Sequence, residues 1–356
     1  MTRFVYIGTY TQSDPSESHR EEGIFVYWMD PVTGRMVFSS SAPGLNPSFL
    51  AFHPRKRVLY AVNELMEGMV SAYAIHPQTG ALTFLNAKPT QGAHPCYVSI
   101  DHRGEWVMCA NYTGGSISLH PILPDGSLGE LSDWVQHQGV LGPNQARQES
   151  PHAHSIDFDP SRNFLLAADL GLDKVMLYRL DRKRGRFLYH GEITLPPGSG
   201  PRHFTFTRDG RTLFVANELG NTVSVFRWDC EKGFAELIET VSTLPSDFSQ
   251  ENIVADIHLS QDESFLYVSN RGHDSLAIFR VLDAEKVTLF PVGYSTVEGS
   301  WPRNFGIDPT GRFIVVANQY SNRVVLFHRY PETGRVEPAG ISLDVPSPVC
   351  IKFYDL

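Results

Sequence analysis

Four residues of the sequence, a histidine, two arginines and a glutamate, could act together on a small anionic molecule. These residues are His154, Arg202, Glu218 and Arg271. Arginine side chains bind phosphate or carboxylate through paired hydrogen bonds. A glutamate beside arginines should stay ionised and could orient or deprotonate water, and His154 is expected to titrate close to neutral pH and to act as an acid or a base. We predict that these four residues are catalytic.

Five further residues are candidates for binding the substrate. They are His152, His203, His258, Arg303 and Glu64. The sequence has no GxSxG motif and no cysteine with a suitable local pattern. Direct attack by water, or proton transfer, is therefore favoured over a covalent intermediate.

Metal binding is an alternative use of these side chains. Glu64, Glu218 and Asp256 could offer oxygen ligands to calcium or magnesium, but adjacent arginines would repel a cation. His152 and His154 alternate along an expected strand, so both rings would project to one side and could bind zinc, although no third ligand lies nearby. We predict no metal and no cofactor.

The candidate residues occur at defined points of an internal repeat. Four segments run 16 residues from a proline to an asparagine, and they begin at Pro47, Pro95, Pro201 and Pro302. Segments from Ala153 and Val254 fit the same frame, with Asp169 and Asn270 in the asparagine place. Each segment is typical of two short strands joined by a turn, and two more strands follow it. This spacing indicates propeller blades.

The two ends of the chain share a seventh repeat. PVCIKFYDL at the carboxyl end supplies only a first strand, and RFVYIGTYT at the amino end starts with a second strand. Joining the ends completes a blade and hides the open sheet edges. We therefore predict an all-β fold, a single seven-bladed β-propeller domain spanning residues 1–356, with four antiparallel strands per blade.

The repeat also predicts where the candidate residues meet. In an antiparallel blade, the start of the first strand and the end of the second lie at one edge. Residues at these two points should therefore surround one mouth of the central channel. The first ring is Ser48, Cys96, His154, Arg202, Ala255, Arg303 and Val349, and the second is Tyr10, Glu64, Tyr112, Leu170, Glu218, Arg271 and Gln319.

Recurrence separates residues that serve the blade from residues that serve a function. The recurring asparagines are expected to bond backbone groups at the second turn; they are Asn63, Asn111, Asn217, Asn270 and Asn318. The charged ring residues occur in only a few blades, which indicates a site; the alternative is an ion-pair network around the rim. Three long segments at the same edge, Thr11–Gly23, His137–Pro151 and Pro245–Asn252, could form pocket walls or be tolerated insertions.

Composition excludes several classes of partner. The 356 residues include 30 Lys and Arg against 39 Asp and Glu, a formal charge of −9, with no basic run. Binding to nucleic acid or to an anionic membrane is therefore not expected. No apolar signal segment or 18-residue apolar stretch occurs, so we expect a cytoplasmic protein, either a monomer or a weak homo-oligomer.

At the candidate residues the chain resembles the lactonase family of seven-bladed β-propellers, which includes cycloisomerase-type 6-phosphogluconolactonases and the related carboxy-cis,cis-muconate cyclases. The resemblance runs the full length and is most specific in GPRHFTFTRDGRTLFVANELGNTVSVF from Gly200 and in ADIHLSQDESFLYVSNRGHDSLAIF from Ala255. YIGTYT and PHAHSIDFDP are also similar to the family. The site proposed for the cyclases has a His, an Arg, a Glu and a second Arg, which match His154, Arg202, Glu218 and Arg271 here.

The resemblance implies hydrolysis of 6-phospho-D-glucono-1,5-lactone to 6-phosphogluconate, a step of the oxidative pentose phosphate pathway, with a small anionic lactone as the partner. Arg202 and Arg271 would hold the anionic substrate and the developing oxyanion, and Glu218 and His154 would be the base and the acid. The alternatives are a cyclase or lactonase acting on a non-phosphorylated acid or sugar lactone, and a non-catalytic propeller that serves as a binding scaffold.

Overall fold

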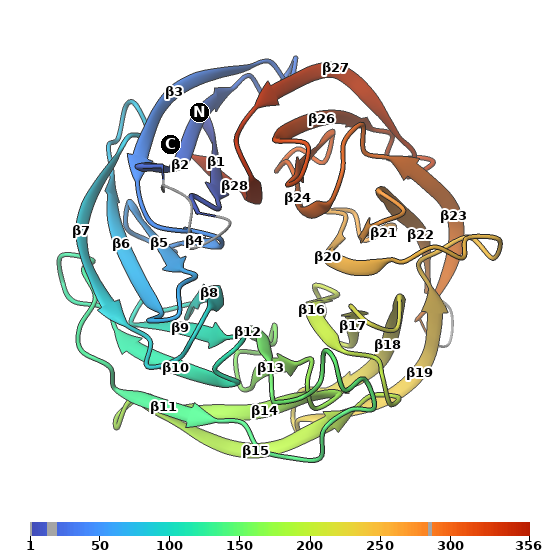
Figure 1. The fold of residues 1–356 in the computed structure, drawn as a ribbon, viewed down its shortest axis with the longest axis horizontal. Coiled ribbons are helices and arrows are strands. Elements are labelled where there is room, and N and C mark those ends of the chain that lie inside the picture. The colour runs from blue at the N-terminus through green and yellow to red at the C-terminus, as the bar shows by residue number, and fades with distance from the viewer. Residues whose placement is uncertain (1, 13–19, 284–286) are drawn as a thin grey trace.

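The computed structural model describes residues 2–12, 20–283 and 287–356. In this part of the chain, 28 strands form seven four-stranded antiparallel sheets arranged around a common axis (Figure 1). The predicted seven-bladed β-propeller is therefore confirmed. Among the described residues there is no helix long and apolar enough to cross a membrane.

The strands of each blade are ordered from the axis outward (Figure 1). The innermost strands are β4 (Leu50–Phe52), β8 (Pro95–Ile100), β12 (Ala153–Phe158), β16 (Pro201–Phe206), β20 (Ile253–Leu259), β24 (Pro302–Ile307) and β28 (Pro348–Asp355). The second strands are β5 (Val58–Asn63), β9 (Trp106–Asn111), β13 (Leu165–Asp169), β17 (Thr212–Asn217), β21 (Phe265–Arg271), β25 (Phe313–Asn318) and β1 (Arg3–Thr9).

The third strands are β6 (Met69–Ile75), β10 (Ser116–Pro121), β14 (Lys174–Asp181), β18 (Thr222–Asp229), β22 (Ser275–Asp283), β26 (Arg323–Arg329) and β2 (Glu22–Met29). The outermost strands are β7 (Leu82–Pro89), β11 (Asp133–Gln136), β15 (Arg186–Thr194), β19 (Phe234–Ser242), β23 (Val287–Thr296), β27 (Val336–Asp344) and β3 (Met36–Pro43). We number blades 1 to 6 from the blade that begins with β4 to the blade that begins with β24. The split blade contains β28, β1, β2 and β3.

The burial of the strands follows from the packing of blade on blade. Every residue of β5, β17 and β25 is buried, because both faces of a second strand pack against neighbouring blades. In a strand covered on both faces, polar and apolar residues are not expected to alternate, and these strands are nearly continuous apolar runs. The outer strand β27 instead alternates exposed and less exposed residues, as expected for the outer edge of a blade.

The recurring asparagines hold consecutive blades together. Their amides donate to carbonyls of the connection that enters the blade, as Asn63 does to Leu45 (2.8 Å), Asn270 to Thr243 (2.8 Å) and Asn318 to Val297 (3.0 Å). The predicted bonding to backbone groups is confirmed for these three, although the groups lie in the entering connection and not at the second turn. Asn217 instead donates to the hydroxyls of Thr222 and Ser224.

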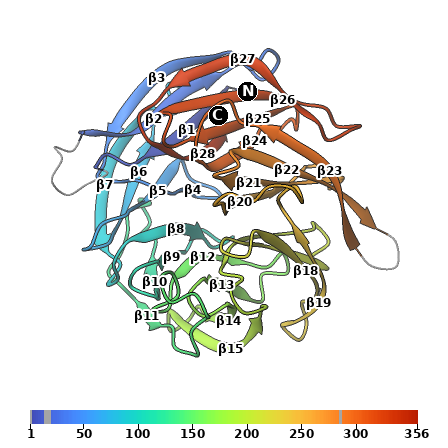
Figure 2. The same cartoon turned by 45° about the vertical axis from the view of Figure 1, so that its right-hand side comes forward.

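The split blade closes the ring as predicted. Strand β1 pairs with β28 in an antiparallel register that places Phe4 opposite Tyr354 and Ile7 opposite Ile351. The buried Arg3 side chain then bonds to both carboxylate oxygens of Asp355 and, at 2.7 Å, to Asp308 of blade 6. One guanidinium thus joins the two chain ends and the preceding blade. The ribbon shows the two chain ends close together at strands β1 and β28 (Figures 1 and 2).

Candidate active site

The first ring of candidate residues is built from β-bulges. In blades 2, 3, 4 and 6 and in the split blade, the innermost strand shifts its register by one residue at the point where it begins. The extra residues are Cys96, His154, Arg202, Arg303 and Val349. A bulge leaves its extra residue unpaired and changes the direction of the side chain, and such bulges are frequent beside active sites.

The bulges direct side chains from separate blades toward one point. Ser48, Cys96, Arg202, Arg303 and Val349, which come from five blades, line one cavity of about 10 Å³, the space of about one water molecule. Five of the seven positions of the predicted first ring therefore lie around one cavity. We call the end of the axis at which the innermost strands begin the mouth.

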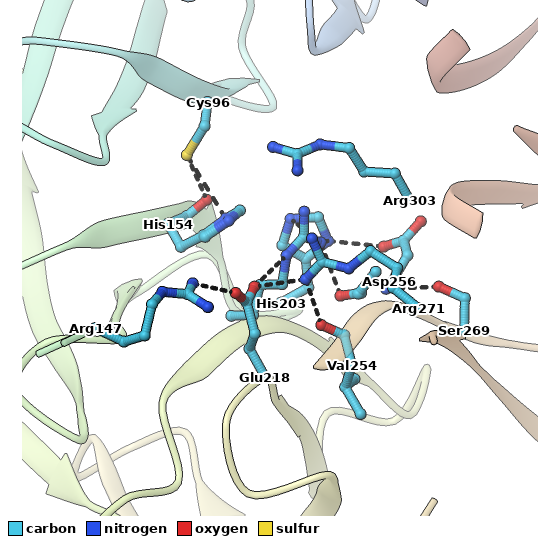
Figure 3. A network of polar contacts seen from close by, with 12 residues as sticks. Cys96, Arg147, His154, His203, Glu218, Val254, Asp256, Ser269, Arg271 and Arg303 are labelled. Carbon is cyan, nitrogen blue, oxygen red and sulfur yellow. Dashed lines mark hydrogen bonds and ion pairs between the residues drawn. The ribbon is translucent and has the colours of Figure 1, made fainter. Parts of the chain in front are cut away.

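Glu218 lies at the centre of an ion-pair cluster in this mouth (Figure 3). Its Oε2 is 3.0 Å from Arg202 Nε and 2.8 Å from Arg271 Nη2, and its Oε1 is 2.5 Å from Arg147 Nη2. The side chains of Glu218, Arg202 and Arg271 are each only 3% exposed, whereas Arg147 is 36% exposed. The predicted second ring thus meets the first at a buried carboxylate.

Backbone carbonyls fix the two buried arginines of this cluster. Arg202 Nη1 donates to the carbonyl of Ala255, and Arg271 Nη2 donates to the carbonyl of Val254, both at 2.8 Å. The two acceptors are consecutive residues at the start of β20. The guanidinium groups are therefore held in place by the blade as well as by Glu218.

The surrounding charges determine the protonation state of Glu218. Burial alone would raise the pKa of this carboxyl, but the charges of Arg271, Arg202 and Arg147 outweigh burial and lower its pKa to about 2. Glu218 is therefore ionised throughout the physiological range, as the sequence predicted. A carboxylate with so low a pKa is a weak proton acceptor and a strong hydrogen-bond acceptor.

His154 is a neutral imidazole in this environment. Its ring is buried, and burial lowers its pKa well below the usual range, with a further decrease from Arg202, His203 and Arg303. Its Nδ1 lies 3.6 Å from the sulfur of Cys96. The expectation that His154 titrates near neutral pH is wrong, because it did not account for burial beside several cations. The neutral ring can accept a proton, but it carries no additional proton to donate.

Arg303 enters the mouth from the side opposite Glu218. Its guanidinium reaches toward Cys96 and His154 (Figure 3), and its Nη2 donates to the Tyr10 hydroxyl at 2.8 Å. Glu64 lies beside this pair, with 4.0 Å between Arg303 Nη2 and Glu64 Oε1. The pKa of Arg303 is raised by Tyr10, Glu64 and Glu218 although burial opposes this.

His203 and His258 belong to a second network below the mouth. His203 Nδ1 is 2.7 Å from Asp256 Oδ1, and His258 Nε2 is 2.8 Å from Asp256 Oδ2. The His203 ring also contacts Arg202 Nη1 at 3.3 Å and lines the small cavity, which His258 does not. Burial and the charge of Arg202 lower the pKa of His203 to about 4 despite Asp256. His203 therefore supports Arg202 from below, while His258 lies further along the strand.

The structure separates His152 from the Glu218 cluster. His152 Nδ1 is 3.0 Å from the carbonyl of Tyr112, and its Nε2 is 3.1 Å from Glu149 Oε1. The bulge at His154 interrupts the alternation that the sequence suggested for the two histidines. The Tyr112 ring contacts both rings, stacking on His152 and meeting His154 edge to face. Among the described residues, no three His, Cys, Asp or Glu side chains gather as a metal site would require.

Sequence reasoning missed Arg147. This residue lies in the segment His137–Pro151, which the sequence marked as a long segment at the mouth without naming a residue. The segment is anchored at both ends, by His137 Nδ1 at 2.7 Å from Asp169 and by Gln148 Nε2, which donates to Asp173 Oδ1 at 2.8 Å. Asp169 replaces the recurring asparagine in this blade. This replacement was the one signal in the sequence that pointed to the segment, because a carboxylate at the asparagine position implies a different partner in the connection that enters the blade.

Asp173 couples this segment to Arg202. Besides the bond from Gln148, its carboxylate accepts the backbone N–H groups of Gly198 and Gly200 at 2.7 Å each. Gly200 in turn accepts the backbone N–H of Glu218 at 2.7 Å. A single buried carboxylate thus links the segment that carries Arg147 to the backbone that leads into Arg202 and accepts the N–H of Glu218. Of the other two long segments, Thr11–Gly23 lies partly outside the described residues, and Asn252 of Pro245–Asn252 donates to Asn270.

A family model described as "Lactonase, 7-bladed beta-propeller" matches residues 4–353. The chain belongs to this lactonase family. A family member from Bacillus subtilis (strain 168), named 6-phosphogluconolactonase, is 38% identical over 356 residues and is covered at 99% of both chains.

Two solved structures of lactonases superpose on the whole chain. The crystal structure of a putative 6-phosphogluconolactonase from Bacteroides fragilis gives a TM-score of 0.91 at 36% identity, covering 99% of this chain and 98% of that one. A periplasmic gluconolactonase from Pseudomonas aeruginosa gives a TM-score of 0.92 at 35% identity, covering 100% and 99%. The resemblance noted from the sequence is therefore confirmed, and the chain is a member of a family of lactone-hydrolysing enzymes.

Proposed function

We propose that the protein hydrolyses 6-phospho-D-glucono-1,5-lactone to 6-phosphogluconate, the second step of the oxidative pentose phosphate pathway. The observation that carries this proposal is the convergence of three arginines on the buried Glu218 in a family whose curated relative bears that activity as its name. An intramolecular ester with a phosphate group needs a cationic site that can also stabilise a developing oxyanion.

The charge balance of the mouth supports an anionic substrate. Arg147, Arg202, Arg271 and Arg303 bring four positive charges, against the two carboxylates of Glu218 and Glu64. His154 adds no charge, because its pKa is depressed. The excess positive charge favours phosphate, and Arg303, which donates to the Tyr10 hydroxyl and lies 4.0 Å from the Glu64 carboxylate, is the candidate for holding that group.

The same groups suggest how water is added. Water attacks the lactone carbonyl carbon while neutral His154, a weaker base than an ordinary imidazole because its pKa is lowered, accepts a proton from it. Arg202 and Arg271 stabilise the negative charge that forms on the carbonyl oxygen. The bond from carbon 1 to the ring oxygen then breaks, and the ring oxygen takes the proton back from His154. This assignment makes His154 the base, one of the two roles that the sequence left open for it. Glu218 holds the two arginines in position and stays ionised throughout.

A specific observation favours a second candidate, the hydrolysis of non-phosphorylated sugar lactones. The structural neighbour from Pseudomonas aeruginosa is a gluconolactonase at 35% identity, and such a substrate would use His154, Arg202, Glu218 and Arg271 without engaging Arg303 as a phosphate site. A cytoplasmic location stays a prediction, since that neighbour is described as periplasmic. The expectation of a monomer or weak homo-oligomer also stays a prediction.

The test is the rate of lactone opening by the purified protein after exhaustive chelation. We expect 6-phosphogluconolactone to open far faster than it does spontaneously, with a higher kcat/KM than D-glucono-1,5-lactone. Activity should survive chelation because the arginines provide the positive field. A rate equal to the spontaneous one would refute the function. Activity lost on chelation and restored by calcium or magnesium would refute the metal-free chemistry alone.

A further inference from the structure

The mouth contains a second compartment beside the arginine cluster. It is a cavity of about 760 Å³ bordered by blades 6, 1 and 2 and the split blade, and it includes Tyr10, Glu64 and Gln319 of the second ring. Glu64 also lines the small cavity at Arg202 and Arg303, so the two spaces adjoin. This volume is typical of sites that enclose a whole drug-sized molecule. It exceeds what the remainder of a single six-membered lactone needs.

The side chains of this compartment carry almost no charge, and apart from Leu65 and Met66 each of them has a polar atom. Its lining includes four amides, those of Gln12, Asn46, Gln319 and Asn322. Among the described lining residues there is no lysine or arginine, and Glu64 is the only carboxylate. A phosphate here would meet the negative charge of Glu64, and the guanidinium of Arg303, 4.0 Å from that carboxylate, lines the adjoining small cavity and not this compartment. Hydroxyl groups of a ligand could instead donate to the carboxylate of Glu64 and to the amide oxygen of Gln319.

Two of the amides give the compartment a fixed wall. Asn46 Oδ1 accepts the backbone N–H groups of Thr11 and Gln12 at 2.9 and 3.0 Å. Asn322 Oδ1 accepts the backbone N–H of Ser347 at 2.7 Å. These amides are engaged by the protein itself and position the backbone around the cavity.

Two other groups retain bonding capacity. Glu64 Oε2 and Gln319 Oε1 are buried and have no hydrogen-bond partner among the described residues. Buried polar atoms without a partner are costly and uncommon in native proteins. Both residues line the compartment, and a side-chain rotation that brings these oxygens to its surface would let hydroxyl groups of a ligand satisfy them.

An aromatic pair, of which Tyr320 is exposed and Trp301 is partly buried, lies on the side of the compartment near Glu218. Tyr320 lines the cavity, is 61% exposed and stacks on Trp301 with ring centroids 4.8 Å apart. The guanidinium of Arg271 lies 5.5 Å from the Trp301 ring, which connects this pair to the ion-pair cluster. A large exposed ring beside amide groups can pack against the C–H face of a sugar whose hydroxyls bond to the amides.

We propose that this compartment binds a neutral sugar attached to the reacting lactone. The substrates of the enzyme would then include glycosylated aldonolactones, in which a hexose is linked to the gluconolactone ring. The inference rests on the proposed function, because it assumes that the lactone carbonyl lies at Arg202 and Arg271. It adds a neutral polyhydroxylated group as the second recognised part of the substrate.

The test uses stable open-chain products as probes, so that binding is measured apart from catalysis. Calorimetric titration of the full chain with cellobionate and with gluconate should show at least about tenfold tighter binding of cellobionate, the gain expected from one or two added hydrogen bonds. Gln319→Leu and Tyr320→Ala should each remove most of this gain. Gln78→Leu, in the exposed turn between β6 and β7, is the matched control and should retain it. Equal affinities of the two probes for the wild-type protein would overturn the inference.

A catalytic comparison separates this inference from the function on which it rests. The 1,5-lactone of cellobionic acid should be opened with a higher kcat/KM than D-glucono-1,5-lactone, and Gln319→Leu should lower the ratio of the two values. Opening of 6-phosphogluconolactone without any preference for cellobionate would overturn the second compartment and leave the function intact. Preferential binding of cellobionate without opening of any lactone would overturn the function and retain the compartment.

Discussion

The mouth has two halves, the ion-pair cluster around Glu218 and Arg271 and the compartment lined by Gln319 and Glu64. They differ in chemistry although the backbone supplies equivalent positions to both. Glu218 and Arg271 follow the recurring asparagine position of blades 4 and 5, and Gln319 and Glu64 follow it in blades 6 and 1. The first pair belongs to a buried cluster of charges, and the second pair lines a polar cavity with no lysine or arginine in its described lining. The repeat thus determines where a side chain points, and its identity at each blade determines what the mouth can do.

The halves also differ in how firmly their functional side chains are held. Arg202 and Arg271 each have a backbone carbonyl and the Glu218 carboxylate as partners. Gln319 Oε1 and Glu64 Oε2 have no hydrogen-bond partner among the described residues. A prepositioned cluster suits a reaction centre, where geometry must not change during the reaction. Unengaged polar atoms suit a surface that selects among ligands.

The largest effect is expected from opening the ring, which would disrupt both halves together. Removing residues 347–356 deletes β28 and the Arg3–Asp355 bond, so β1 loses its inner partner. We expect most of the stability to be lost, as measured by thermal unfolding. A truncated chain that melts at the full-length temperature would contradict the role assigned to the split blade.

Among the arginines that bear on substrate binding, apart from Arg202 and Arg271, the largest effect should come from Arg147, the arginine of the cluster that the repeat does not supply. Arg147→Ala should raise KM for 6-phosphogluconolactone by about tenfold, because a partly exposed guanidinium contributes less than a buried one. Arg147→Lys keeps the charge and should recover part of the loss. An unchanged KM and kcat in Arg147→Ala would show that this residue belongs to an ion-pair network without a role in substrate binding.

A smaller effect that depends on the substrate is expected from Arg303, which lies between the halves. Arg303→Ala should raise KM for the phosphorylated lactone several-fold, about 1 kcal/mol, and affect D-glucono-1,5-lactone less. Steady-state kinetics with the two substrates measure the difference. An equal increase in KM for both lactones would show that Arg303 does not bind the phosphate.

The smallest effect on turnover is expected from Asp157, on the innermost strand of blade 3 and outside both halves. Burial raises the pKa of Asp157 to about 6 from an ordinary 3.8, although Lys352 opposes this. The carboxyl therefore favours folding only when protonated, and this contribution is lost as pH rises from about 4 through 6. Asp157→Asn should stabilise the protein above pH 6 by at most about 3 kcal/mol and have no effect below pH 4. Melting curves across this range test the sign.

Much of the fold and the site could be predicted from the sequence because the repeat reports backbone geometry. The 16-residue spacing from Pro201 to Asn217 implied that Arg202 and Glu218 would meet at one edge, and they do. The protonation of His154 could not be predicted, since it depends on burial by neighbouring blades and on the charges of Arg202 and Arg303. Strand patterning also did not predict the bulge that turns His154 away from the alternation with His152.

The central claim is that the cationic half is the reaction centre and not a structural network of ion pairs. The most direct test is turnover of 6-phosphogluconolactone by Glu218→Gln and Arg202→Ala, measured per folded molecule. Each should be lowered by roughly 10²-fold or more, the scale of losing an oxyanion donor or the group that holds it. Glu236→Gln, in the exposed pair with Arg227, is the matched control and should not change the rate. If both mouth variants are folded and keep near wild-type rates, the cluster is only structural and the catalytic assignment is wrong.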